Sequence, residues 1–466
     1  MARRLLLINP AHVVAGRVYR GPAQFPIPPL NLGYVAALTP PGWEVRIVDE
    51  NLRGGRRVGF EGVGAWRPDL VGLTALTPNA PRAYALAAHY RALGVPVVIG
   101  GVHASAVPEE AGRYVDSVVV GDAEAVWHEV VADCEAGALK PRYAGAFASL
   151  EGLARPRREL YGRGYFTEIA ITSKGCPGHC DFCSIWRFYG QRYRVRPVAE
   201  VVDEVATLDP RKLIFFADDN LTQTPQRVIE LCREMVARGV RRPFAIQGAL
   251  SLADQEELLV WLKRAGCLFV FVGLESLNAT ALAHIGKPNL LGEAGEGYRT
   301  RLAALHRQGL AVYGSFIVGL DDDTPEVFGR LERFILEAEI DCALINILAP
   351  TPGTVLWERL AAEGRLLYTA FPQDYVYYTQ DTVAFRPAQM TPQRLEAGAR
   401  ELIRRLNRAP VRLARARRTW QHTRSVPATA IAWAWNRRSG AAARRPPLRP
   451  APEGMGHPVA VVRGAD

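Results

Sequence analysis

The chain has 466 residues, of which 48% are hydrophobic, and it carries 57 Lys and Arg against 47 Asp and Glu. This length exceeds one ordinary hydrophobic core and predicts two or three domains, while the apolar fraction excludes a mainly disordered chain. The formal net charge of +10 is local, because residues 391–466 alone carry +12 and the first 390 residues about −2. A near-neutral body argues against a nucleic-acid-binding core, so we expect no nucleic-acid partner.

Signals for secretion and membrane insertion are weak. No segment reaches about 18 uninterrupted apolar residues, which predicts no transmembrane helix. The apolar run at residues 5–8 is too short for a signal-peptide core. Seven Cys are too few for a disulfide scaffold, and three of them lie within eight positions, which favours a reducing compartment and a metal site. We therefore expect a cytoplasmic protein.

Residues 1–140 alternate short β-branched runs with helical patterns, which predicts a doubly wound, Rossmann-like parallel sheet in an α/β fold. The predicted strands are residues 5–8, 45–48, 70–76, 97–99 and 118–120, with helices at 80–93 and 123–134. Ligands of such sheets bind at the carboxyl ends of the strands. Glycines follow two of these strands, where they let the backbone approach a ligand closely, although simple tight turns explain them equally well.

A looser stretch at residues 141–164 contains Pro and Gly and is typical of a linker. A second α/β series occupies residues 165–390. Its predicted strands are residues 168–172, 213–217, 244–247, 268–273, 312–318 and 343–348, with helical patterns such as 227–237 and 255–265 between them. Six β/α units are enough for a partial (β/α)6 TIM-like barrel and too few for a closed eight-stranded one.

The strongest chemical signal is a group of three Cys directly after the first strand of the second series. Cys176, Cys180 and Cys183 have spacings x3 and x2. Three thiolates on one loop can hold three irons of a [4Fe-4S] cluster and leave the fourth iron open for a substrate or cofactor. A structural zinc site needs four ligands, and His179 is poorly placed between two ligating Cys to be the fourth. The remaining cysteines fall in helix or strand patterns typical of core residues: Cys134, Cys232, Cys267 and Cys342.

With this C-x3-C-x2-C motif, the chain resembles the radical S-adenosylmethionine (SAM) superfamily. In that family the open iron chelates SAM, and reductive cleavage of SAM yields a 5′-deoxyadenosyl radical. The resemblance implies SAM contacts in residues 215–220, 247, 273–276 and 316–320, which end or line later strands. The SAM-binding residues implied are Asp218, Asp219, Asn220, Gln247, Glu275, Ser276 and Gly319. For residues 218–220, a solvated turn that caps a helix is the alternative interpretation.

A doubly wound domain directly before such a barrel resembles the cobalamin-binding domain of the cobalamin-dependent radical SAM subfamily. Residues 71–78, 100–104 and 120–124 look like the ligand-facing loops of that domain. The cobalamin-binding residues implied are Asn9, Thr74, Thr77, Gly100, Gly101, His103, Gly121 and Glu124. The D-x-H-x-x-G motif that gives cobalt a His ligand in many cobalamin proteins is absent, with His12 in its nearest element. A loop histidine with local hydrogen bonds is an equally good interpretation of His103.

The resemblance, which covers residues 1–390, implies three cofactors: a [4Fe-4S] cluster, SAM and cobalamin. The expected reaction is C-methylation of an unactivated carbon of a lipid or secondary metabolite. A radical SAM oxidative cyclase, resembling the anaerobic magnesium-protoporphyrin ester cyclase, is the alternative enzyme, and a non-catalytic cobalamin or redox sensor is the alternative of another class. The expected partners are a small-molecule substrate and an electron donor such as a flavodoxin or ferredoxin.

Residues 391–438 are predicted to be a helical extension, and residues 439–466 a disordered Arg- and Pro-rich tail. Leu395, Ala399, Leu402 and Leu406 share one face of the first helix, with Arg on the other. Aliphatic and aromatic residues beside Arg in residues 411–415 and 430–438 suit a helix on the surface of an anionic membrane. Packing on the barrel is an equally good interpretation of the extension, so peripheral membrane contact is one of two expectations.

Overall fold

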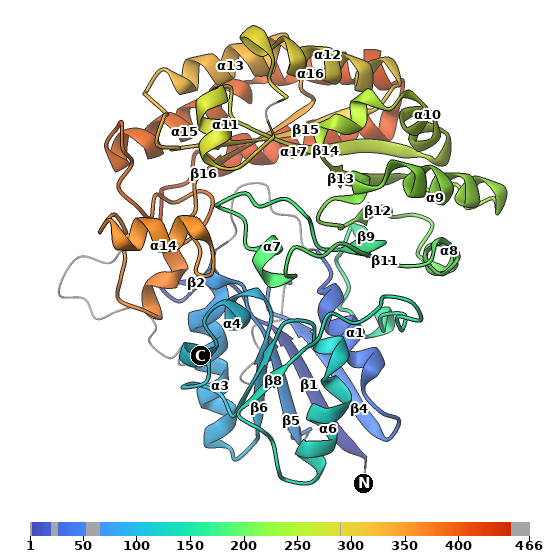
Figure 1. The fold of residues 1–466 in the computed structure, drawn as a ribbon, viewed down its shortest axis with the longest axis vertical. Coiled ribbons are helices and arrows are strands. Elements are labelled where there is room, and N and C mark those ends of the chain that lie inside the picture. Colours follow the sequence, from blue (N-terminus) through green and yellow to red (C-terminus); the bar gives the residue numbers. More distant parts are fainter. Residues whose placement is uncertain (1, 20–26, 53–65, 289, 449–466) are drawn as a thin grey trace.

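The computed structural model describes residues 2–19, 27–52, 66–288 and 290–448 (Figure 1). Within them the chain forms two parallel six-stranded sheets, one after the other along the sequence. Figure 1 shows the first sheet at the bottom and the second at the top, with the short helix α7 (Ile185–Phe188) between them. The predicted fold class, a Rossmann-like domain followed by a partial barrel and a helical extension, is confirmed.

The front sheet has the strand order β4-β1-β5-β6-β7-β8, with all neighbours parallel. Its strands are β1 (Arg3–Asn9), β4 (Trp43–Asp49), β5 (Leu70–Thr74), β6 (Val97–Gly100), β7 (Ser117–Val120) and β8 (Arg142–Ala144). Apolar side chains are buried on both faces of the sheet, under α1 (Leu30–Leu38) and α6 (Trp127–Glu135) on one side and α3 (Ala80–Ala92) on the other. β1 lies between β4 and β5, so the chain changes direction across the sheet there. In sheets of this kind a ligand crevice forms at this point, at the carboxyl ends of the strands, and we call this region the strand-end crevice.

The second sheet has the order β16-β15-β14-β13-β12-β9, again all parallel. Its strands are β9 (Thr167–Ala170), β12 (Leu213–Phe216), β13 (Phe244–Gly248), β14 (Cys267–Glu275), β15 (Ala311–Val318) and β16 (Cys342–Ile347). The helices between them are α8 (Val198–Thr207), α9 (Pro225–Ala237), α10 (Glu256–Ala265), α12 (Glu296–Arg307) and α13 (Val327–Glu337). β9 and β16 do not pair, so the barrel stays open on one side.

Every predicted strand is present, and the differences lie at the ends of elements. β8 falls inside residues 141–164, because residues 142–144 pair with β7 and extend the front sheet beyond the predicted linker. β14 continues to Glu275 through an irregular register between Gly273 and Glu275. Two short ribbons were not predicted: β2 (Val13–Val14) with β3 (Arg17–Val18), and β10 (Ser173–Lys174) with β11 (Arg194–Val195).

The C-terminal extension packs on the barrel as three helices, α15 (Pro392–Leu406), α16 (Ala409–Thr423) and α17 (Val426–Ala442). The predicted apolar face of α15 is buried in the barrel core. Ala428 and Ala432 of α17 lie in a cluster with residues at the starts of β14, β15 and β16, so α17 covers the amino-terminal end of the barrel. Trp435 packs against Tyr313, with ring centroids 4.6 Å apart.

This packing bears on two expectations about the extension. Trp435 contacts the barrel and Trp433 lies under the guanidinium of Arg412, which fits the interpretation that the extension packs on the barrel. α17 also continues to Ala442, beyond the predicted boundary at residue 438. The predicted tail from residue 449 onward lies outside the described residues. Among the helices that the structure describes, none is both long and apolar enough to cross a membrane.

Candidate functional site

The three-Cys loop follows β9 at the carboxyl end of the barrel. Cys176, Cys180 and Cys183 are half-buried free thiols. Burial, and to a smaller degree the neighbouring thiols of Cys180 and Cys176, raise the pKa of the Cys183 thiol to about 11. Three thiols gathered in this way need a cationic group nearby to ionise together, which is what an iron–sulfur cluster supplies. The residues present therefore fit a cluster held by three Cys.

The remaining cysteines lie elsewhere, as expected. Cys267 and Cys342 are buried at the starts of β14 and β16, which is the opposite end of the barrel from the loop. Cys232 is buried on α9, and Cys134 lies on α6 of the front domain. No fourth thiol from the described part of the chain joins the loop, so one iron of a cubane cluster would have no Cys ligand here.

Gly175 and Asp219 fix the start of the three-Cys loop. Gly175 has φ +92, and a Cβ at this position would lie 1.9 Å from the carbonyl oxygen of Arg192, so only glycine fits. Its backbone N–H donates to Oδ2 of Asp219 at 2.8 Å. Gln247 donates to the backbone carbonyl of Asp219 at 3.4 Å. The predicted SAM-binding residues Asp219 and Gln247 therefore lie directly beside the loop.

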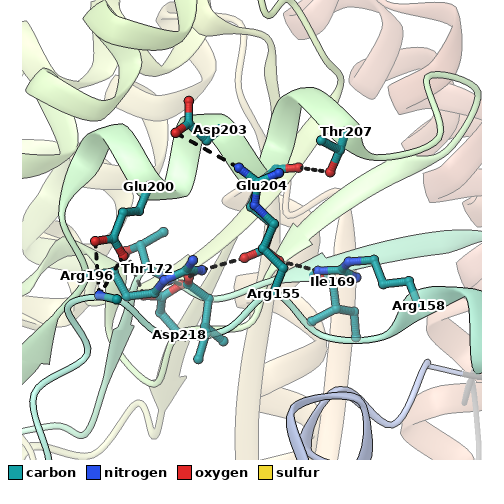
Figure 2. Close-up of polar contacts among 12 residues, drawn as sticks. Arg155, Arg158, Ile169, Thr172, Arg196, Glu200, Asp203, Glu204, Thr207 and Asp218 are labelled. Atoms are coloured by element: carbon teal, nitrogen blue, oxygen red, sulfur yellow. Dashed lines mark hydrogen bonds and ion pairs between the residues drawn. The ribbon is translucent and has the colours of Figure 1, made fainter. Parts of the chain in front are cut away.

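Asp218 lies deeper and holds the chain between β9 and the loop. Its carboxylate accepts from the backbone N–H and the hydroxyl of Thr172, at 3.0 and 2.8 Å, and from the hydroxyl of Ser173 (Figure 2). Only 1% of Asp218 is exposed, and burial raises its pKa to about 6. Because its oxygens are engaged and covered, we assign Asp218 a positioning role in place of the predicted SAM contact.

A buried ion network supports the same segment and was not found from the sequence. Glu204 of α8 pairs with Arg196 at 2.7 Å and with Arg158 (Figure 2). The backbone N–H of Arg196 donates to the carbonyl of Thr172 at 2.8 Å, and Arg227 donates to the same carbonyl at 3.0 Å. Charges buried in this way are satisfied only in one arrangement, so the network fixes the chain that leads into the three-Cys loop.

Glu275 and Ser276 lie at the end of β14, where the backbone is strained. Glu275 has φ +65, a conformation that residues other than glycine adopt mainly at functional sites. Its carboxylate accepts from the Lys287 ammonium at 3.3 Å, and Gly273 leaves room for it, since a Cβ there would lie 2.2 Å from Glu275 Oε1. Burial raises the pKa of Glu275, and Lys287 partly offsets this. Burial also lowers the pKa of Lys287, but Glu275 and the thiols of Cys180 and Cys176 hold it above its ordinary value. Lys287, which sequence reasoning missed, thus lies beside the thiols.

The other implied SAM residues join neighbouring strand ends. Asn220 Oδ1 accepts from the backbone N–H of Ala249, which links the ends of β12 and β13. Gly319 has φ +94, and a Cβ on it would lie 2.6 Å from Leu395 of α15. Its backbone N–H donates to Asp323 at 2.9 Å. These positions line the carboxyl end of the barrel.

In the front domain, His103 and Thr77 bind each other and do not face open space. His103 is fully buried, with its ring nitrogens 3.1 Å from the Tyr84 hydroxyl and 3.3 Å from the Thr77 hydroxyl. Tyr375, from the segment after the barrel, packs against the His103 ring. The interpretation of His103 as a locally hydrogen-bonded histidine fits this geometry. His12 is also engaged, with Nε2 2.8 Å from the carbonyl of Val376, and burial lowers its pKa to about 4.

The remaining implied cobalamin residues surround the strand-end crevice. Asn9 donates to Asp49 at 3.0 Å, and the Thr74 hydroxyl accepts from Asn31 at 2.8 Å. Gly100 ends β6; Gly101, with φ +95, and Gly121, with φ +81, follow β6 and β7. A Cβ on Gly101 would lie 2.8 Å from the Thr74 hydroxyl. Gly100, Gly101 and Gly121 add no side chain at their own positions, which would leave room for a flat corrin ring at this end of the sheet.

Ion pairs join the crevice to the three-Cys loop. Lys174, two residues before Cys176, lies 2.6 Å from Glu124 and 3.3 Å from Asp122 of the front domain. Arg194 lies 2.6 Å from the other oxygen of Asp122. Asp122 and Lys174 are 5% and 11% exposed, so these charges are largely removed from water. Glu124, implied by the resemblance as a cobalamin contact, holds the two cofactor sites together.

Comparisons with known proteins agree with this architecture. The B12 binding domain family matches residues 16–131, and the radical SAM superfamily matches residues 170–335. The chain is 31% identical to the bacteriochlorophyllide d C-12(1)-methyltransferase of Chlorobaculum tepidum, over 77% of this chain and 78% of that protein. It is 30% identical to the hopanoid C-2 methylase of Rhodopseudomonas palustris, over 73% of this chain and 66% of that protein.

The fold also matches solved structures. The radical SAM methyltransferase TsrM from Kitasatospora setae, with cobalamin and a [4Fe-4S] cluster bound, superposes with a TM-score of 0.66 at 20% identity, covering 86% of this chain and 88% of that one. The cobalamin-dependent radical enzyme OxsB superposes with a TM-score of 0.65 at 13% identity, over 92% and 72%. The predicted cofactor set is thus confirmed at the level of both domains: the chain belongs to the family of cobalamin-dependent radical SAM enzymes.

Proposed function

We propose that this chain is a C-methyltransferase that acts on an unactivated carbon of a bulky hydrophobic small molecule, such as a tetrapyrrole or a polycyclic lipid. One observation carries the proposal: Lys174 ties Glu124 of the cobalamin crevice to the segment that leads into the three-Cys loop. This ion pair supports the proposal because it brings a predicted cobalamin residue next to the segment that leads into the predicted cluster loop. The similarity to methyltransferases of bacteriochlorophyllide d and of hopanoids supports the reaction and the substrate class.

When bound, the cluster supplies the electron that cleaves SAM, and cobalamin supplies a transferable methyl group. The protein contributes the residues that would hold these cofactors in place. Cys176, Cys180 and Cys183 would hold the cluster, while Glu275 would accept from the SAM ribose or amino group, and Lys287 pairs with that carboxylate at 3.3 Å. The glycines after β6 and β7 would receive the corrin. Neither His103 nor His12 is free to bind cobalt, so cobalamin would have no lower ligand from these two histidines.

The proposed reaction and substrate class are tested with SAM that carries a trideuterated methyl group. Anaerobically reconstituted full-length enzyme, with cobalamin and a chemical reductant, is incubated with hydrophobic extract from the source cells. A methylase adds three deuterium atoms to a carbon of a product found by mass spectrometry. The cyclase alternative has the support of 29% identity to the anaerobic magnesium-protoporphyrin IX monomethyl ester cyclase of Cereibacter sphaeroides, over 73% of this chain and 60% of that protein. A cyclase would give a product without deuterium. A non-catalytic sensor predicts no SAM cleavage at all.

The Asp122 ion pairs give a stability prediction. Replacing Asp122 by Asn leaves the buried Lys174 and Arg194 cations without their shared partner, and breaking a buried pair in this way costs about 3 kcal/mol of unfolding free energy. Urea denaturation of the full chain measures it. Glu109→Gln is the control, because Glu109 pairs with Arg142 at the surface, where both side chains are about half or more exposed and the loss stays below about 1 kcal/mol. Equal losses for the two variants would remove the proposed role of Asp122.

Electron delivery by a flavodoxin or ferredoxin, a cytoplasmic location and peripheral membrane contact stay predictions. For membrane contact, α16 offers the more exposed face, because its Leu413 and Trp420 are 64% and 40% exposed. They lie seven residues apart on one helix face together with exposed Arg417 and Arg424. Flotation with anionic liposomes of the full chain, beside Leu413→Asn/Trp420→Ser, tests this face. Equal flotation of both proteins would remove the lipid contact.

The division of the chain stays a proposal as well. We keep residues 1–140 as the cobalamin domain, 141–164 as a linker and 165–390 as the barrel. The predicted extension (391–438) and tail (439–466) meet inside α17, so we place their boundary after Ala442, where α17 ends. Limited proteolysis of the full chain locates the boundaries. Because β8 pairs with β7, we expect the first cut between the domains to fall after residue 144.

A further inference from the structure

At the amino-terminal end of the barrel, far from the three-Cys loop, three side chains with metal-binding atoms meet. His306 is in the last turn of α12, Asp341 directly precedes β16, and His422 is in the last turn of α16. One ligand atom from each of the three lies within 4.8 Å of the other two. The side chains of Asp341, His306 and His422 are 1%, 8% and 19% exposed. Three separate segments thus place a buried His-Asp-His group in one spot.

Two atoms of this group are buried and lack a hydrogen-bond partner. Oδ2 of Asp341 accepts from the backbone N–H of Val312 at 2.7 Å and lies 3.1 Å from Nε2 of His306, while Oδ1 has no hydrogen bond. Nδ1 of His422 likewise has none. A buried carboxylate oxygen and a buried imidazole nitrogen without partners cost free energy. A shared cation would satisfy both atoms at once.

The ring nitrogen of His422 that faces away from the group, Nε2, has a carboxylate partner, as the second nitrogen of a metal-binding histidine commonly does. This Nε2 lies 2.9 Å from a carboxylate oxygen of Glu339. A proton held on Nε2 leaves the lone pair on Nδ1, so the unpartnered nitrogen is the one that can bind a metal. The His306 and His422 rings stack with centroids 4.0 Å apart and an angle of 21° between them. Both rings therefore lie beside Asp341 and beside each other.

We propose that His306, Asp341 and His422 bind one divalent transition-metal ion, with zinc as the best match, and that the ion fastens α16 to the base of the barrel. Two imidazoles and one carboxylate are ligands that zinc prefers, and a water would complete the tetrahedron. Zinc bonds of 2.0–2.1 Å place neighbouring ligand atoms about 3.3 Å apart, so small rotations of the two rings close the site.

The surrounding contacts explain why an ion would be useful at this place. The guanidinium of Arg415 donates to the backbone carbonyls of Ile340 and Asp341, and Asn436 donates to the carbonyl of Asp341. Helices α16 and α17 are therefore already joined to the segment that carries Asp341, and α12 and α16 lie side by side at the top of Figure 1. Arg415, and Arg418 paired with Glu339 at 3.2 Å, bring positive charge nearby, which the two carboxylates offset.

The test measures zinc in the full-length, cluster-loaded protein, whose cysteines are occupied by iron. The protein is equilibrated with zinc, desalted over a weak chelator and analysed for zinc, iron and sulfide. We expect about one more zinc per chain in the wild type than in His306→Gln or His422→Gln. Zinc should raise the melting temperature of the wild type but not that of these two variants. His284→Gln is the matched control, because His284 pairs with Asp322 at 2.9 Å without a third ligand, and it should keep the zinc.

A variant that retains a ligand guards against simple misfolding. His422→Cys should still bind metal, and with cobalt as the probe it should gain the strong thiolate-to-cobalt absorption that the wild-type site, with nitrogen and oxygen ligands only, lacks. Equal zinc in the wild type, His306→Gln and His422→Gln, or an unchanged cobalt spectrum in His422→Cys, would overturn the proposal. The group would then be a pair of His–carboxylate ion pairs. Neither result bears on SAM cleavage, which takes place at the other end of the barrel.

Discussion

Replacing Cys180 by Ala is expected to abolish both cluster binding and reductive cleavage of SAM. Cys180 lies between the other two thiols in the loop, and its backbone carbonyl accepts from the Trp186 indole at 3.0 Å, so it is fixed at the centre of the site. With two thiolates left, the cluster has too few protein ligands. Iron and sulfide analysis after anaerobic reconstitution, followed by chromatography of 5′-deoxyadenosine, measures both losses.

Cys134→Ala is the control, because Cys134 is half-buried on α6 and lies in the front domain. It should keep four irons per chain and full cleavage. Retention of the cluster and of cleavage by Cys180→Ala would contradict the assignment of the three ligands. Loss of both by Cys134→Ala would show that reconstitution depends on thiols outside the loop.

A single methyl group at Gly175 is expected to reduce SAM cleavage by about 100-fold, which is the cost of moving a reacting group by roughly 1 Å. The Cβ would lie 1.9 Å from the carbonyl oxygen of Arg192, and φ +92 is strained for alanine. The chain must shift, which breaks the hydrogen bond from the Gly175 N–H to Asp219 and moves Cys176, the next residue. The rate of 5′-deoxyadenosine formation per cluster measures the effect.

Gly137→Ala separates this clash from the general cost of alanine at a positive φ. Gly137 has φ +67, and a Cβ there meets nothing within 4 Å. This variant should lose about 1–2 kcal/mol of stability and keep its activity. If Gly175→Ala and Gly137→Ala have the same activity, the close approach of Gly175 to the Arg192 carbonyl does not position the loop.

Much of the architecture follows from local signals. The β-branched runs and the helical patterns between them predict all twelve main strands except β8, which has only three residues and an unremarkable sequence. The spacing of the three Cys is by itself enough to predict a cluster site. Strand-end residues such as Asp219 and Gln247 were also predictable, because the carboxyl ends of parallel strands meet at one edge.

Contacts between distant segments could not be predicted. Lys174 and Glu124 are fifty residues apart, and nothing in either neighbourhood indicates the other until the two domains are placed together. Lys287 follows a glycine in a loop without a motif, yet it lies beside Glu275 and the thiols. α17 has apolar and small residues around much of its surface, and only the barrel base decides which of them are buried.

Asp218 shows a different limit. The sequence places it beside Asp219 and Asn220 at a strand end, and a SAM contact is expected of all three. Side chains of successive residues point in different directions, so one carboxylate faces the loop and the other faces the interior. Which of the two faces the ligand depends on Thr172 and Ser173, which lie more than forty residues earlier.

As a C-methyltransferase, the chain would use SAM twice, once for cleavage at the three-Cys loop and once to replace the methyl group that cobalamin gives to the substrate. The direct test is the ratio of the two SAM-derived products formed by the reconstituted enzyme with its substrate. Methylation predicts that 5′-deoxyadenosine and S-adenosylhomocysteine form in equal amounts. Without added cobalamin, it predicts no methylated product and no sustained formation of S-adenosylhomocysteine. Formation of 5′-deoxyadenosine and converted substrate with no S-adenosylhomocysteine would contradict the account and assign the chain to the cyclases.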